Sequence, residues 1–98
     1  MMKLQPDETL LIGNWITENG KARADAVCER IAWLIANHLK KVSDHPQSGA
    51  WETLYRDPAD GRLWERTYPQ GEMQGGGPPQ LGWLPKESAT QKYGTAVA

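Results

Sequence analysis

The clearest hydrophobic pattern in the chain is a helical stripe across residues 24–42. Its apolar side chains recur at steps of three and four residues, at Val27, Ile31, Leu34, Ile35, Leu39 and Val42. Acids lie near the start of the stripe and lysines near its end, as the helix dipole favours. These residues are Asp25, Glu29, Lys40 and Lys41. The pattern predicts one amphipathic helix of about five turns, ended by the Ser-Asp-His-Pro run that follows.

Residues 51–68 change to an alternating pattern rich in strand-forming side chains. The two halves are joined by Asp57-Pro58-Ala59-Asp60-Gly61, in which Pro58 suits the first central position of a type I turn and Gly61 can take the left-handed conformation. We predict a β-hairpin with the loop at 58–61. One face then carries the aromatic residues Trp51, Tyr55, Trp64 and Tyr68, with Trp51 opposite Tyr68, Tyr55 opposite Trp64 and Thr53 opposite Arg66. The other face carries Glu52, Leu54, Arg56, Leu63, Glu65 and Thr67.

The remaining segments add shorter elements. Residues 10–16 are apolar enough for a first strand, and Asn19-Gly20 is the signal of a short hairpin. Residues 81–84 predict a further strand, and residues 86–93 predict a short C-terminal helix ended by Gly94. We expect residues 1–9 and 94–98 to be loose. The fold class is then α+β, in one domain spanning residues 1–98, with an antiparallel sheet of about four or five strands packed against the long helix.

Composition and charge exclude several classes of protein. The formal net charge of −1 and the isoelectric point near 6.1 lack the basic excess of a nucleic-acid binder. No apolar run reaches the roughly 18 residues of a membrane span, and the N-terminus lacks an apolar signal-peptide core. Cys28 is the single cysteine, which excludes an internal disulfide and predicts a small buried side chain. We expect a cytoplasmic protein with no cofactor and with neither nucleic acid nor membrane as partner.

Candidate chemistry is sparse, so we expect no enzyme, no catalytic residues and no metal site. His38 falls on the helical stripe and has a mainly structural role in this interpretation. The carboxylates of Glu52 and Glu65 share a face of the hairpin and could form an acid/base pair. Arg56 and Arg66 are close enough in sequence to be their ion-pair partners instead.

Residues 69–85 are rich in Gly and Pro, including Gly75-Gly76-Gly77-Pro78-Pro79. This is no phosphate-binding loop, because two prolines follow the glycines where Lys and Ser or Thr would be needed. We favour a rigid connector that packs on the protein's own tryptophans. The alternative is a peptide- or ligand-binding module, in which this loop lines a pocket together with Trp15 and Trp83.

A resemblance to a known family follows the same segments. Its motifs are Gly49-Ala50-Trp51-Glu52-Thr53-Leu54-Tyr55-Arg56-Asp57-Pro58-Ala59-Asp60-Gly61-Arg62, Trp64-Glu65, Thr67-Tyr68-Pro69-Gln70 and the Gly-Pro loop, preceded by Glu8, Leu11, Gly13, Trp15, Asp25, Arg30-Ile31 and Leu34. With these motifs, residues 5–93 resemble immunity protein family 27 of bacterial polymorphic toxin systems. The resemblance implies a small cytoplasmic protein that binds and blocks the C-terminal effector domain of a cognate toxin.

A docking surface can be suggested from the hairpin. If the helix covers the aromatic face, the opposite face lies in water, with apolar centres ringed by charge. The candidate toxin-binding residues are Glu52, Arg56, Asp57, Asp60, Glu65 and Thr67. Cover by the C-terminal segment is the alternative. The slight acidic excess of residues 51–72 would suit a basic toxin such as a nuclease.

Overall fold

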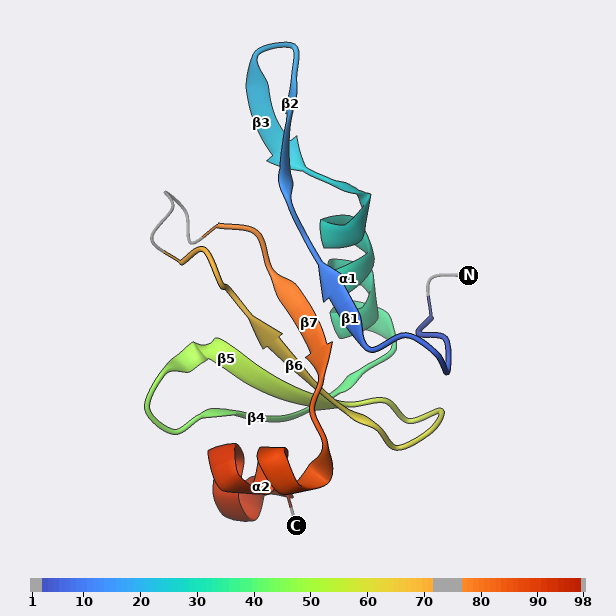
Figure 1. The fold of residues 1–98 in the computed structure, drawn as a ribbon, viewed down its shortest axis with the longest axis vertical. Helices are drawn as coiled ribbons and strands as arrows, with labels where there is room; N and C mark the ends of the chain where they lie inside the picture. Colours follow the sequence, from blue (N-terminus) through green and yellow to red (C-terminus); the bar gives the residue numbers. More distant parts are fainter. Residues whose placement is uncertain (1–2, 72–76, 98) are drawn as a thin grey trace.

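The protein folds into a five-stranded antiparallel sheet with a helix on each face and a small hairpin that projects from one end (Figure 1). The computed structural model describes residues 3–71 and 77–97. The strands of the sheet, in spatial order, are β1 (Leu10–Ile12), β7 (Gln80–Trp83), β6 (Leu63–Thr67), β5 (Gly49–Arg56) and β4 (Lys40–His45). The other elements are β2 (Trp15–Glu18), β3 (Lys21–Ala24), α1 (Ala26–Asn37), α2 (Lys86–Tyr93) and a 3-10 helix (Gly94–Val97). The predicted α+β class is confirmed.

Helix α1 begins at a capped turn and ends earlier than predicted. The Asp25 side chain accepts a hydrogen bond from the backbone N–H of Cys28 at 2.9 Å, which satisfies a donor at the helix start. The prediction of a helix through Val42 was wrong, because residues 40–45 form the edge strand β4. A step of three residues keeps two side chains on one face of a helix but puts them on opposite faces of a strand. Accordingly, Leu39 packs with α1 and Val42 packs with α2.

The hairpin of β5 and β6 has the predicted register. Tyr55 pairs with Trp64 and Thr53 pairs with Arg66. Asp57 closes the turn, because its carbonyl accepts the Gly61 N–H at 2.7 Å and its N–H donates to the Arg62 carbonyl at 2.9 Å. The side chain of Asp57 also accepts a bond from a backbone N–H within the turn at 2.8 Å. This hairpin is therefore defined locally, by turn chemistry and alternation.

Each face of the sheet buries its own apolar cluster. The cluster under α1 consists of Leu11, Ile31, Leu34, Leu39, Tyr55, Trp64 and Leu81. The cluster under α2 and the 3-10 helix consists of Leu54, Leu63, Ala89, Tyr93 and Val97. Of the two possibilities for the second face, exposure to water or cover by the C-terminal segment, the structure shows cover of its apolar centre. The expected looseness of residues 94–98 is not found at Val97, which is 3% exposed.

The predicted first strand is divided into β1 and β2 near Gly13. The Gly13 N–H donates to the Pro79 carbonyl at 2.9 Å, and a Cβ at this position would lie only 2.6 Å from that oxygen. Glycine is required here because no larger residue allows this close approach. The predicted short hairpin is confirmed, with Asn19 at φ 53° and Gly20 at φ 76° between β2 and β3. Gly75 and Gly76 of the predicted connector lie outside the described residues.

Candidate functional site

Trp51 is the most exposed of the large apolar side chains in the described part of the chain, at 55%. It lies near the start of β5, where the register with β4 shifts and residues 50–52 have no partner on that strand. Its ring packs edge to face against Tyr68, with 5.5 Å between centroids and an interplanar angle of 84°. The side chain is thus held in a fixed position on the surface while much of it stays in water.

Two hollows share Trp51 and Tyr68 as a common wall. One, of about 550 Å³, is lined by Ser48, Trp51, Glu52, Thr67, Tyr68, Pro69, Gly71 and Gln80. The other, of about 530 Å³, is lined by Ser48, Ala50, Trp51, Arg66 and Tyr68. Alternate residues of a strand point to opposite faces of the sheet. Glu52 and Thr67, which line the first hollow, therefore lie on the α2 side, and Arg66, which lines the second hollow, lies on the α1 side. We call this pair of hollows the Trp51 surface.

Two of the predicted docking carboxylates, Glu52 and Glu65, are paired with helix α2. The ammonium of Lys92 contacts both, at 2.7 Å in the case of Glu65. The hydroxyl of Tyr93 donates to Glu65 at 2.8 Å. The hydrogen bond from Lys92 lowers the pKa of Glu52. Burial favours a lower pKa for Lys92, but its bonds to Glu52 and Glu65 outweigh burial and raise it. These carboxylates therefore hold α2 on the sheet. In the described ranges they pair with Lys92 and form no ion pair with Arg56 or Arg66, the arginines predicted as their partners.

The third predicted carboxylate, Asp57, is buried and has an internal partner. It is 1% exposed, and its Oδ1 lies 2.8 Å from Nε2 of His38 at the end of α1. This contact ties the helix to the hairpin turn, which agrees with a structural role for His38. Cys28 is buried, as predicted, and burial raises the pKa of its thiol. Neither His38 nor Asp57 offers a surface to a partner.

Arg56 and Asp60 lie away from the Trp51 surface. They line a separate hollow of about 470 Å³ that also contains Trp83. Asp60 is bound to Arg62, with 2.7 Å between Oδ2 and Nε. The six predicted docking residues therefore do not line one hollow, because Glu52 and Thr67 share the first while Arg56 and Asp60 share this separate one.

The predicted aromatic face divides in the same way. Tyr55 and Trp64 are in the core under α1, at 5% and 0% exposed. Trp51 and Tyr68 lie further along the ribbon, outside this buried cluster, and form the wall between the two hollows. The alternation of the strand is as predicted, but only half of the face is covered.

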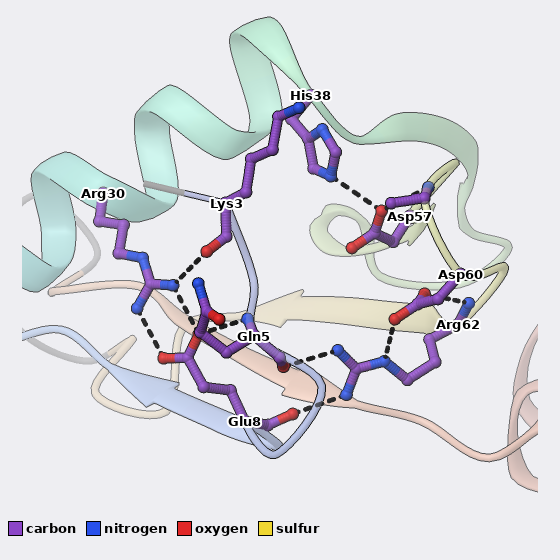
Figure 2. Close-up of polar contacts among 9 residues, drawn as sticks. Lys3, Gln5, Glu8, Arg30, His38, Asp57, Asp60 and Arg62 are labelled. Atoms are coloured by element: carbon purple, nitrogen blue, oxygen red, sulfur yellow. Dashed lines mark hydrogen bonds and ion pairs between the residues drawn. The ribbon is translucent and has the colours of Figure 1, made fainter. Parts of the chain in front are cut away.

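A polar network anchors the N-terminal segment, which the sequence predicted to be loose (Figure 2). Arg30 of α1 donates to both carboxylate oxygens of Glu8, at 2.7 and 2.6 Å, and to the carbonyl of Lys3. Arg62 of the hairpin donates to the carbonyls of Glu8 and Gln5, at 2.7 and 3.0 Å. The bonds from Arg30 lower the pKa of Glu8 to about 2. Residues 3–8 are thus a clasp between α1 and the β5–β6 turn.

The described residues offer no grouped metal ligands. Within residues 3–71 and 77–97, no three His, Cys, Asp or Glu side chains gather closely enough to hold a metal ion. None of the helices in these ranges has the length and apolar character needed to cross a membrane.

A comparison with protein families decides where the chain belongs. The family model described as immunity protein 27 matches residues 17–85, well over half of the sequence. The chain belongs to the immunity protein 27 family. Its function is therefore immunity in a toxin system, and the partner of such a protein is a protein toxin. No curated protein and no solved structure matches the chain.

Many of the motif residues that this chain shares with the immunity protein family make contacts within the structure itself. Asp25 caps α1, Arg30 holds Glu8, and Gly13 allows the close approach of Pro79. These residues stabilise the fold, whereas Trp51 is the most exposed of the large apolar motif residues in the described part of the chain. Sequence reasoning missed Lys92 and the separation of the docking residues. No local signal could reveal either, because both depend on where α2 packs.

Proposed function

We propose that this immunity protein neutralises its toxin by direct binding, with the Trp51 surface as the contact. The observation that carries the proposal is the exposed Trp51 ring, held against Tyr68 between two hollows of about 550 and 530 Å³. Tryptophan is enriched among the few residues that dominate binding energy, and a ring already fixed in place loses little entropy on binding. Glu52 and Thr67 would contribute the polar edge of this contact.

The proposed partner is, more specifically, the C-terminal effector domain of the cognate toxin. The immunity protein would block this domain in the cytoplasm of the producing cell without any catalysis of its own. The family match supports a protein toxin as the partner. The idea of a basic nuclease rested on the slight acidic excess of residues 51–72, in which Glu52, Asp57, Asp60 and Glu65 were expected to face the toxin. Each of these acids has an ion-pair or hydrogen-bond partner within the chain, so charge no longer favours that class of toxin.

The test is calorimetry with the C-terminal domain of the cognate toxin, which we expect to be a large secreted protein encoded upstream of the gene. Wild type should bind it and protect cells that express it. Trp51→Ala should weaken binding at least tenfold, about 1.4 kcal/mol, because the substitution removes the ring that forms the wall between the two hollows.

Trp83→Ala is the matched control, since Trp83 is 44% exposed in a different hollow. It should keep wild-type affinity. If Trp51→Ala binds like wild type while Trp83→Ala loses affinity, the contact lies at the Trp83 hollow instead. If wild type does not bind the domain at all, direct neutralisation is wrong.

A further inference from the structure

Arg66 of β6 lines the second of the two hollows of the Trp51 surface. It forms no ion pair with any residue in the ranges that the structure describes. Its Nη2 donates to the Ala50 carbonyl at 2.7 Å and to the Thr53 hydroxyl at 3.1 Å. Its Nε is buried and has no acceptor. An unsatisfied buried donor destabilises the fold, and more so when it is charged.

The neighbouring charges do not neutralise this guanidinium. Asp44 is the acid that approaches it, through the Thr53 hydroxyl, which donates to Asp44 Oδ1 at 2.9 Å. Asp44 is itself paired with Lys41 at 3.0 Å. Two cations therefore share one carboxylate in this corner of the sheet, and a positive charge remains.

The guanidinium is flanked by apolar surfaces on two sides. The first is the hollow of about 530 Å³ walled by Trp51 and Tyr68, and the Tyr68 ring lies 5.1 Å from the Arg66 guanidinium carbon. The second is a hollow of about 240 Å³ between α1 and the sheet, lined by Ile31, Ile35 and Pro79 among others, with Arg66 and Tyr68 at its edge. Arg66 therefore lies between two hollows that are both lined largely by apolar side chains.

From this geometry, and resting on the proposed function, we propose that the partner presents an acidic side chain to Arg66, flanked by apolar side chains that enter the two hollows. A carboxylate suits the guanidinium because it accepts charge-assisted hydrogen bonds, which are about twice as strong as neutral ones. A protein segment fits better than a free small acid, since the hollows on either side require apolar groups attached to the same ligand. The toxin surface that docks here is thus acidic and apolar, the opposite in charge of a basic nuclease cleft.

The first experiment uses peptide probes and does not depend on the toxin. NMR titration follows the Arg66 Nε–H and Trp51 indole N–H signals with acetyl-Ala-Glu-Leu-Ala-amide and with its Gln counterpart. The Glu peptide should give saturable shifts of both signals and bind at least fivefold more tightly than the Gln peptide. In Arg66→Gln the preference should vanish, whereas Arg56→Gln, an exposed arginine on β5, should retain it. Equal response to both peptides, or no saturable shift at Arg66, overturns the proposal.

The second experiment uses the C-terminal domain of the cognate toxin. Arg66→Gln should weaken its binding at least tenfold, Arg66→Lys less, and Arg56→Gln not at all, with thermal melts showing that each variant is folded. Unchanged affinity in folded Arg66→Gln overturns the inference while direct neutralisation stands. A domain that wild type does not bind overturns direct neutralisation, and the peptide result then decides the Arg66 site alone. If Arg66→Gln fails to fold, Arg66→Lys and the peptide preference decide.

Discussion

At the scale of single residues, the five tryptophans of this chain have unequal tasks. Trp64 is completely buried between the sheet and α1, and the Arg62 guanidinium carbon lies 4.9 Å from the centre of its ring. Trp51 is on the same face of the same hairpin yet is 55% exposed. The difference is position along the ribbon, because α1 reaches the one and not the other.

We therefore predict opposite effects of the same substitution at these two positions. Trp64→Ala should lower the free energy of unfolding by about 3–5 kcal/mol, since it empties a large core site. Trp51→Ala should lower it by less than about 1 kcal/mol, as is usual for exposed residues. Chemical denaturation of both variants measures this. Equal losses of stability in the two variants would contradict the difference in burial between Trp64 and Trp51.

At the scale of elements, α2 is held to the sheet by a small apolar contact and by one cation between two carboxylates. Ala89 and Tyr93 are buried one turn apart, and Lys92 lies beside them against Glu52 and Glu65. Burial, and then the hydrogen bond to Glu65, raises the pKa of the Tyr93 hydroxyl. Without Lys92 the two carboxylates would face each other under the helix with no counter-charge.

Lys92→Met should destabilise the fold by about 1–2 kcal/mol near neutral pH, a value reduced because the Lys92 side chain is 33% exposed. The pH dependence should also change sign. In wild type, the lowered pKa of Glu52 gives stability that is lost as the pH falls. In Lys92→Met, repulsion between Glu52 and Glu65 is relieved by protonation, so their contribution to stability grows as the pH falls.

Urea unfolding of both proteins at about pH 7 and about pH 4 measures these changes. Lys86→Met, an exposed lysine at the start of the same helix, is the control and should behave like wild type. A Lys92→Met protein with wild-type stability at both pH values would show that α2 is held by its apolar contact alone.

At the scale of the whole molecule, the clasp of residues 3–8 closes the structure across α1 and the hairpin turn. The carboxylate of Glu8, with its pKa lowered from 4.5 to about 2 by Arg30, is the charge on which this clasp depends. A lowered folded pKa contributes stability that is fully present above the unfolded pKa. That stability is lost as the pH falls through the range from 4.5 toward 2.

Glu8→Gln should therefore unfold more easily at neutral pH, by about 1–2 kcal/mol once solvent screening of this partly exposed pair is allowed for. The difference from wild type should shrink as the pH approaches 2, where wild-type Glu8 is also protonated in part. Asp7→Asn, at the exposed neighbouring acid, is the control and should follow wild type at every pH. A constant difference between Glu8→Gln and wild type across this range would exclude the ion pair as its cause.

Patterns set by neighbours in the chain were sufficient for much of this fold. The turn at residues 57–61, the register of Tyr55 with Trp64, the short hairpin at Asn19-Gly20 and the extent of α2 all follow from local turn chemistry, alternation and helix ends. These features depend on contacts between residues close in sequence, so the sequence alone was enough to predict them. The family resemblance, which the match over residues 17–85 confirms, likewise needed no coordinates.

Only the tertiary structure decided the features that depend on which surfaces meet. The step from Leu39 to Val42 fits both a helix face and the two sides of a strand, and pairing of β4 with β5 selected the strand. The sequence does not show whether the charged face of the hairpin is exposed. In the structure α2 covers its centre, and Lys92 pairs with its two carboxylates. Such choices compare burial across distant segments, and no local pattern contains that comparison. This packing leaves Trp51 exposed and leaves Arg66 without an ion pair among residues 3–71 and 77–97.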